Sequence, residues 1–469
     1  MSRPGAAMLR EERSGTVPMD TLYLSNDVSV RQQVAWKKAL TKAKQQLSSQ
    51  KSRRLDSDAP QPLGWKQGPN DAEGLRQLIL LDPISLLLFA FPIGVAAHFL
   101  EWRAIFVFWL NFFAMIPLAK LMGDATEELA AGLKSDTIGG LLNATFGNAV
   151  EMILMVQTLR SDKKGNIKVV KGTLLGSILS NLLLVLGMSF IAGGVTPRDG
   201  KVLNKRQVFS TVVALTNVTM LLLATAAMAL PTIFFSTLGT QFEEQHSMLG
   251  MQFEEEQHSK FEEEQHSRTL KVSRYCSIYI LSAYVAYLLF QLYTHAEAFS
   301  AGEDSEDEDL QPQLSICGAL GLLVVTTIMV AFSSEFLVDS LDSLVEDWGI
   351  GRSFIGIVLL PIVGNACEHA GAIRMAMSEK VDITIGIAVG SSTQVALFVV
   401  PFAVLTGWIL DQPMDLNFGP LDTTVLVFAV LLTFSIITDG MSTWLEGYML
   451  FIAYVIVATL YWFFPETPG

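Results

Sequence analysis

Two glutamates stand inside apolar stretches of this sequence, where a charged side chain is costly. Each belongs to a Gly-Asn-x-x-Glu motif, and the two copies are Gly147, Asn148 and Glu151, and Gly364, Asn365 and Glu368. An ionised carboxylate at the centre of a membrane costs on the order of 3 kcal/mol unless it faces a wet cavity or a partner. No lysine or arginine lies within one helical turn of either glutamate. The two side chains are therefore expected to be protonated or to hold a cation.

The spacing within each motif favours a cation site made of oxygen atoms. Asn and Glu three residues apart lie on one face of a helix, so an amide and a carboxylate oxygen point the same way. The preceding glycine permits either a close approach of the backbone or a local helix break that frees backbone carbonyls as ligands. Hard oxygen ligands suit Ca²⁺, whereas Mg²⁺ dehydrates reluctantly. The predicted metal ligands are Glu151, Glu368, Asn148 and Asn365, with Mn²⁺ left open as an alternative cargo.

Protons are expected to compete with the metal for the same oxygens. When the cation leaves, two close carboxylates that have lost their hydration repel each other, so protonation becomes favourable. Exchange of metal for protons follows if the site reorients only when its charge is cancelled. Gly147 and Gly364 complete this predicted cation- and proton-binding site. No catalytic residue, cofactor or nucleic-acid partner is expected.

Further polar residues lie on or beside neighbouring apolar stretches. The accessory polar residues are Ser177, Ser180, Asn181, Ser391, Ser392, Gln394 and His369. The serines could serve only packing and interhelical hydrogen bonding, and His369 is either a proton relay or a packing histidine. Four carboxylates are expected along access routes, unless they only solvate helix ends: Glu127, Glu128, Glu335 and Asp339. The three cysteines, Cys276, Cys317 and Cys367, are expected to be small apolar fillers.

The elements that must position these residues are membrane-spanning helices. The chain has 469 residues, of which 51% are hydrophobic and only 17% are charged. An apolar run of ~20 residues crosses a bilayer as a helix. Eleven spans are predicted, at 79–100, 104–124, 137–159, 169–193, 207–237, 275–296, 314–344, 353–378, 382–409, 421–439 and 443–464. The predicted fold is thus an all-α polytopic membrane protein.

The order of these spans predicts two inverted repeats. An acidic helix, a Gly-Asn-x-x-Glu helix and a Gly-Ser helix follow one another twice. The leading helix 79–100 is set apart, and the rest divides into five spans in 104–296 and five in 314–464. Since five is odd, the second unit enters the membrane upside down, which is a plan of secondary transporters.

Three polar segments flank or interrupt the spans. Residues 1–78 carry 13 basic and 8 acidic residues, and basic residues beside a span favour the cytosolic side. This arm is therefore expected to be cytosolic and largely disordered. The acidic loop 238–274 holds three near-copies of FEEEQHS, which either bind cations in an acidic lumen or are a repeat expansion in a solvated loop. The linker 297–313 contains EDSEDED, which either concentrates divalent cations or is a solvated connection.

The motifs resemble those of the cation/proton exchanger (CAX) family of the Ca²⁺/cation antiporter superfamily. FGNAVEMI and VGNACEHAGAI are similar to its two signature repeats, and ATEELA and SSEFLVDS to its acidic second and seventh helices. LGSILSNLLLVLG and VGSSTQVALFV resemble the helices that complete its site, and EDSEDED stands where the family has an acidic stretch. The FEEEQHS array departs from the family pattern.

The resemblance implies a proton-driven exporter of cytosolic Ca²⁺ into a vacuole or a similar acidic store. It implies that Glu151 and Glu368 are shared carriers of the cation and the protons, and that the N-terminal arm restrains transport. Coupling to Na⁺ or K⁺ is one alternative, and a cation channel or sensor that uses its acidic loops is another. The sequence lacks a G-x-x-x-x-G-K-[ST] phosphate-binding loop, so an ATP-driven pump or another enzyme is not expected.

Overall fold

Apolar helices make up nearly all of the chain that the computed structural model describes, namely residues 70–80, 82–133, 136–161, 166–197, 206–249, 255–296 and 312–465. In the following lists, η marks a 3-10 or π-helical segment. The leading segment and the first half comprise α2 (Asp71–Leu80), η2 (Pro83–Phe89), α3 (Ala90–Phe99), α4 (Ala104–Leu133), α5 (Asp136–Phe146), α6 (Ala149–Arg160), α7 (Asn166–Leu179), η3 (Ser180–Val185), α8 (Leu186–Val195), α9 (Thr211–Leu249), α10 (Glu255–Leu289) and η4 (Phe290–Thr294).

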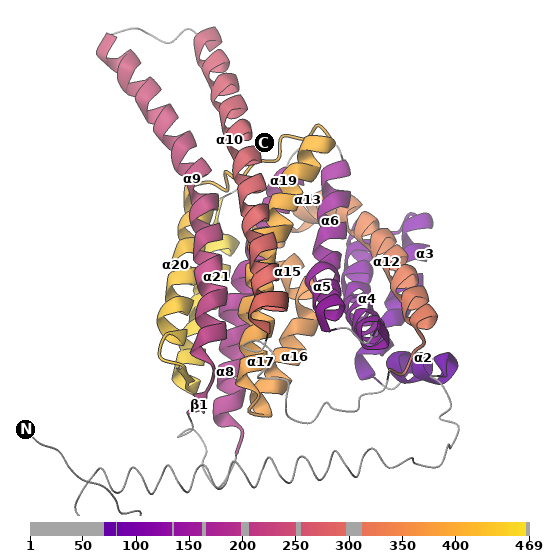
Figure 1. Cartoon of the computed structure of the whole chain (residues 1–469). Coiled ribbons are helices and arrows are strands. Elements are labelled where there is room, and N and C mark those ends of the chain that lie inside the picture. The colour runs from indigo at the N-terminus through magenta and orange to yellow at the C-terminus, as the bar shows by residue number, and fades with distance from the viewer. Residues whose placement is uncertain are drawn as a thin grey trace, which may run out of the picture. The chain divides into compact units, whose positions relative to one another are not determined.

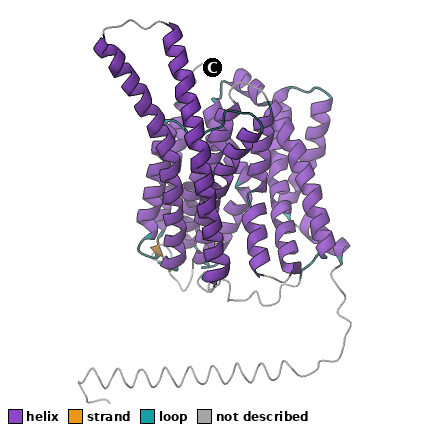
Figure 2. Cartoon of the chain, turned by 45° about the horizontal axis from the view of Figure 1, so that its top comes forward, coloured by secondary structure: helices purple, strands orange, loops and turns teal. Residues whose placement is uncertain are grey.

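The second half contains shorter helical segments that run on from one another. They are α12 (Ile316–Asp339), α13 (Leu341–Trp348), α14 (Arg352–Phe354), η5 (Ile355–Leu359), α15 (Leu360–Gly364), α16 (Ala366–Met377), α17 (Val381–Ile385), η6 (Gly386–Gly390), α18 (Ser391–Gln394), η7 (Val395–Val399), α19 (Val400–Ile409), α20 (Pro420–Ile437) and α21 (Trp444–Phe463). Strands β1 (Gln207–Val208) and β2 (Met441–Ser442) pair antiparallel, with Gln207 opposite Ser442. Figure 2 shows this small ladder at one end of a bundle that is otherwise helical.

The number of spans agrees with the number predicted from the sequence. Among the described residues, nine helices are long and apolar enough to cross a membrane, and two bent helix pairs bring the number to eleven. One bent pair is Asp71–Ile79 with Pro83–Phe99, at 90°, and the other is Arg352–Gly364 with Ala366–Met377, at 58°. The prediction of an all-α membrane protein with one leading helix and two inverted five-helix repeats is confirmed. The chain is an integral membrane protein.

Both Gly-Asn-x-x-Glu motifs interrupt their helices, which is one of the two alternatives that the glycines left open. Helix α5 ends at Phe146 and α6 begins at Ala149, while α15 ends at Gly364 and α16 begins at Ala366. The asparagine at each break leaves the helical region of backbone space, with φ −108° and ψ 20° in the first copy and φ −92° and ψ 14° in the second. Each glutamate therefore stands in the first turn of a new helix, near backbone N–H groups that favour negative charge.

The acidic segment 238–274, expected to be a loop, is mostly helical in the structure, which corrects that expectation. Helix α9 runs on to Leu249 and α10 starts at Glu255, so the two form a hairpin whose arms project beyond the bundle (Figure 1). The rings of Phe242 and Phe261 stack across the arms, with centroids 3.7 Å apart. Glu and Gln are good helix formers, so this repeat extends a helix as readily as it fills a loop. The arm 1–78 was expected to be largely disordered, but its residues 71–78 belong to helix α2. Residues 1–69 and the EDSEDED run lie outside the described residues.

Candidate cation site

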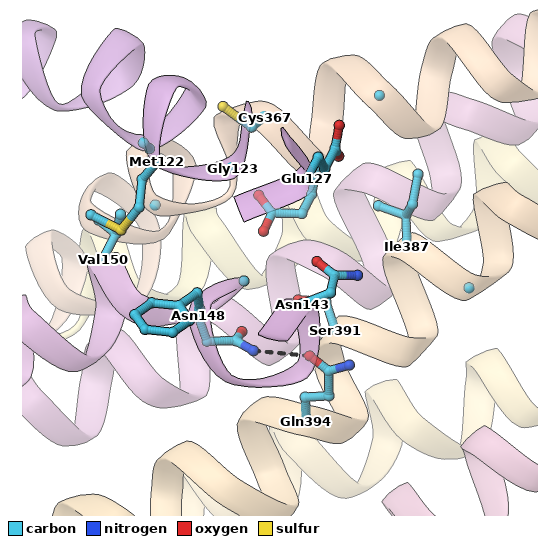
Figure 3. Close-up of a pocket in the computed structure, with 17 residues that line it drawn as sticks. Met122, Gly123, Glu127, Asn143, Asn148, Val150, Cys367, Ile387, Ser391 and Gln394 are labelled. Carbon is cyan, nitrogen blue, oxygen red and sulfur yellow. Dashed lines mark hydrogen bonds between the residues drawn. The ribbon is translucent and has the colours of Figure 1, made fainter. Parts of the chain in front are cut away.

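A cavity of about 270 Å³ lies between the two motifs. Its walls come from both halves of the chain, which Figure 3 shows around the central side chains. The lining residues are Ala119, Met122, Gly123, Glu127, Asn143, Phe146, Gly147, Asn148, Val150, Gly364, Cys367, Glu368, Gly371, Gly386, Ile387, Ser391 and Gln394. The structure therefore brings the first motif, the second motif and the Gly-Ser helix of the second half together around one space.

Hydrogen bonds between the halves hold the two asparagines. Nδ2 of Asn148 donates to Oε1 of Gln394 over 3.0 Å, as the dashed line in Figure 3 shows. In the second motif, Nδ2 of Asn365 donates to Oγ of Ser180 over 2.8 Å and to the carbonyl of Ser177 over 3.1 Å. Oγ of Ser177 in turn donates to Oδ1 of Asn365 over 3.1 Å. Each motif asparagine is thus bonded to the Gly-Ser helix of the other repeat.

Both motif glutamates lie close to the junction of the repeats. Glu368 lines the cavity, and its Oε2 is buried with no hydrogen-bond partner among the residues that the structure describes. Glu151 is only 5% exposed, and its Oε1 lies 3.1 Å from the position that a Cβ on Gly364 would take. A Cβ at this position would require the carboxylate of Glu151 to move by a few tenths of an ångström, so a glycine fits here without displacing it. A buried carboxylate oxygen without a partner requires a proton or a cation.

The donors around the cavity are oxygen atoms of several kinds. Within the described part of the chain, no group of three or more His, Cys, Asp or Glu side chains forms a metal centre. A cation here would therefore rely on two carboxylates supplemented by amide and backbone oxygens. This mixed set of hard ligands fits Ca²⁺, which accepts six to eight oxygens in loose geometry.

The four carboxylates expected along access routes have different surroundings in the structure. Glu127 lines the cavity. Oε2 of Glu128 instead accepts hydrogen bonds from the backbone N–H groups of Gln313, over 2.7 Å, and Leu314, over 3.0 Å. Glu128 therefore holds the start of α12 rather than facing the cavity. Glu335 and Asp339 are exposed on α12 and do not line this cavity either.

The lining extends from the motifs toward one end of the bundle. It follows α4 to Glu127, α16 to Gly371 and η6 to Gly386. At that end α2 meets the start of α12, where both carboxylate oxygens of Asp71 accept hydrogen bonds from Ser315, over 2.6 and 2.7 Å. The lining of the cavity thus extends toward the side of α2.

Some of the accessory polar residues line the cavity, and others do not. Nδ2 of Asn181 donates to Oγ of Ser391 over 3.2 Å, which joins the two Gly-Ser helices, while Ser391 and Gln394 line the cavity. Ser392 donates to the carbonyl of Ala388 in its own helix over 2.9 Å. Nε2 of His369 lies 3.1 Å from Sδ of Met188 in α8, and His369 does not line the cavity.

Two polar lining residues, Cys367 and Asn143, were missing from the site predicted from the sequence. Cys367 was assigned to packing, although its place directly before Glu368 in the second motif was a signal. Asn143 stands one turn before Gly147, and its carbonyl accepts a hydrogen bond from the N–H of Gly147 over 2.9 Å. Its helical spacing from the first motif could have identified it.

Comparison with known proteins identifies the family of this chain. The family model described as sodium/calcium exchanger protein matches residues 103–293 and 318–463. A vacuolar calcium ion transporter of Schizosaccharomyces pombe is 37% identical over 396 residues, which cover 84% of this chain and 88% of the relative. A Ca²⁺/H⁺ antiporter of Aphanothece halophytica is 40% identical over 396 residues, which cover 82% of this chain and 97% of the relative.

Two solved structures share the architecture. Native YfkE is 34% identical and superposes with a TM-score of 0.63, covering 81% of this chain and 100% of its own. The H⁺/Ca²⁺ exchanger CAX superposes with a TM-score of 0.57 at 15% identity, covering 84% of this chain and 93% of its own, and it supports the fold alone. The chain therefore belongs to the sodium/calcium exchanger protein family and, within it, to the cation/proton exchangers, the CAX family of the Ca²⁺/cation antiporter superfamily.

Proposed function

We propose that this protein is a secondary transporter that exchanges Ca²⁺ for H⁺ at the paired glutamates Glu151 and Glu368. The observation that carries the proposal is the buried, unpartnered Oε2 of Glu368, in a cavity to which both repeats contribute. The names of the relatives, a vacuolar calcium ion transporter and a Ca²⁺/H⁺ antiporter, support this cargo.

The exchange follows from charge balance at the two carboxylates. Bound Ca²⁺ cancels both negative charges, with amide oxygen of Asn148 or Asn365 and freed backbone carbonyls completing its shell. When Ca²⁺ leaves, each glutamate takes a proton, because two unneutralised carboxylates in a low-dielectric pocket are strongly unfavourable. In either loaded form the site is neutral and can change its exposure from one side of the membrane to the other. Metal movement in one direction is thereby tied to proton movement in the other.

The direction of transport is proposed from the arm and the cavity. The basic N-terminal arm favours the cytosolic side, and the cavity extends toward the side of α2, which contains the last residues of this arm. In this state the site takes Ca²⁺ from the cytosol and later releases it into an acidic lumen. Several relatives are named vacuolar exchangers, so we propose a vacuolar or other acidic-organelle membrane as its location. The hard oxygen ligands leave Mn²⁺ as a second cargo.

Purified full-length protein in liposomes provides the test. The vesicles are loaded at acidic pH and diluted into neutral buffer with Ca²⁺, in the absence of ATP, Na⁺ and K⁺. We expect uptake that stops when the pH gradient is collapsed and that is lost in Glu151→Gln and in Glu368→Gln. Mn²⁺ is tested in parallel. The control Glu263→Gln removes one carboxylate from the exposed face of α10 and should retain full uptake.

Two outcomes would contradict the proposal. Uptake that ignores the pH gradient would remove proton coupling, and uptake that appears only after Na⁺ or K⁺ is added would favour exchange against an alkali cation. Full activity of both glutamine variants would show that the paired glutamates do not carry the cation. Size-exclusion profiles of the variants establish that they remain folded.

A further inference from the structure

Lys120 lies beside the cation cavity, on the helix that supplies one of its walls. Its Nζ is 2.5 Å from Oδ2 of Asp124, one turn later in α4, and 3.3 Å from Oδ2 of Asp82, which precedes η2. The three side chains are between 22% and 24% exposed. Charges that are mostly shielded from water act on their surroundings more strongly than an exposed surface pair does. The net charge of this cluster of three side chains therefore affects the charged groups beside it.

The neighbour that matters is Glu127. Gly123 and Glu127 in α4 line the cavity, and Asp124 stands directly between them in the sequence. Lys120, Asp124 and Glu127 have the spacing i, i+4 and i+7, which places them along one side of the helix. Both Lys120 and Asp124 interact electrostatically with Glu127. We call the end of the cavity at Glu127 its mouth.

Two further charged groups surround Lys120. Asp82 accepts a hydrogen bond from the N–H of Ile84 over 2.9 Å and caps η2. Arg374, on α16, lines a second, open cavity of about 490 Å³ together with Lys120 and Asp82. Arg374 and Asp82 thus carry opposite charges in the same cavity as Lys120. The charge of Asp124, on the side of the mouth, depends on Lys120 for its neutralisation.

We propose that Lys120, by neutralising Asp124, sets the net charge at the mouth and thereby how strongly the cavity attracts divalent cations. This inference rests on the proposed Ca²⁺/H⁺ exchange. Lys120 does not touch the cation, so it is a positioning residue that acts through Asp124. Without Lys120, Asp124 becomes a second unneutralised carboxylate next to Glu127. A cleft lined by one sign of charge concentrates the opposite ion, and a divalent cation gains twice as much as a monovalent one.

The test compares Ca²⁺ concentration dependence in the liposome assay at low ionic strength. Lys120→Gln is expected to lower KM for Ca²⁺ by a factor on the order of three to ten, because the negative charge of Asp124 is then left without compensation near the mouth of the cavity. The fall should shrink when salt is raised, because the Debye length drops from about 30 Å at 0.01 M to about 10 Å at 0.1 M. The double variant Lys120→Gln/Asp124→Asn restores neutrality and should return KM to within about twofold of the wild type.

Arg268→Gln is the matched control. It also removes one positive charge from an ion pair, that of Arg268 with Glu264 at 2.6 Å, but this pair is exposed on the α10 arm of the hairpin. KM should not change in this variant. A structural role for Lys120 would lower kcat or the yield of folded protein, and Asp124→Asn would not reverse that loss. The reversal of KM by the second substitution is therefore the readout that separates charge from structure.

Each result bears on the inference. An unchanged KM in Lys120→Gln, or a changed KM that the double variant does not reverse, overturns it. If Lys120→Gln cannot be recovered as folded protein, Asp124→Asn alone decides, because leaving Lys120 without this partner should raise KM and an unchanged value overturns the inference. A wild type without pH-driven Ca²⁺ uptake would instead refute the proposed function, so the two failures are distinguishable.

Discussion

Gly364 is the point at which the second motif approaches the carboxylate of the first. A Cβ at this position would lie 3.1 Å from Oε1 of Glu151, closer than nine in ten real Cβ contacts, so the carboxylate would have to move by a few tenths of an ångström. Oxygen ligands bind Ca²⁺ at ~2.3–2.6 Å, a window of about the same width. The substitution Gly364→Ala should therefore weaken one charged ligand without disturbing the helices.

We expect Gly364→Ala to raise KM for Ca²⁺ about tenfold, which corresponds to ~1.4 kcal/mol of binding free energy. The assay is pH-driven Ca²⁺ uptake by liposomes over a range of Ca²⁺ concentrations, with the size-exclusion profile as a check of folding. Gly386→Ala is the control, because Gly386 lines the same cavity and a Cβ there would meet nothing within 4 Å. An unchanged KM in Gly364→Ala, or an equal rise in Gly386→Ala, would refute the proximity of Glu151 to the cation.

Three further predictions concern residues around the site. Glu127→Gln should raise KM several-fold while Glu128→Gln leaves it unchanged, because only Glu127 lines the cavity; equal effects in the uptake assay would contradict this. Asn365→Ala removes three hydrogen bonds and should lower the free energy of unfolding by roughly 2–4 kcal/mol. Thermal unfolding scans of the wild type, Asn365→Ala and the comparison variant Asn365→Asp can measure this loss. Both carboxylate oxygens of Asp71 accept hydrogen bonds from Ser315 at the start of α12. Asp71→Ala removes these contacts and should lower the amide protection factors at the start of α12, as hydrogen exchange of the wild type and the variant at one pH can measure; equal protection would contradict this.

The spans and the repeat order were predictable because they depend on local properties of the chain. A bilayer requires each spanning backbone to satisfy its own hydrogen bonds, so an apolar run of sufficient length becomes a helix whatever its neighbours are. The glycines beside Asn148 and Asn365 left two alternatives, a helix break or a close approach of the backbone, and the structure shows the break. The odd number of spans in each unit then fixed their opposite orientation.

The hairpin of α9 and α10 shows where local reasoning was insufficient. Glutamate and glutamine are compatible with a solvated loop and with a helix, so composition did not distinguish the two. The stacking of Phe242 on Phe261 and the 2.6 Å hydrogen bond from Gln265 to the carbonyl of Phe235 involve residues 19 and 30 positions apart. Contacts of that range are absent from any local pattern.

The sequence by itself determined which residue types could hold a cation, that they occur twice, and that the two copies face each other upside down. The tertiary structure alone decided which of them meet. It paired Asn148 with Gln394 and Asn365 with Ser180, placed Glu127 in the cavity, and left Glu128 to hold α12. The physical reason is that the spacing of residues along a helix determines which side chains lie on the same face of that helix. Which other helix contacts that face depends on how the helices pack in the bundle.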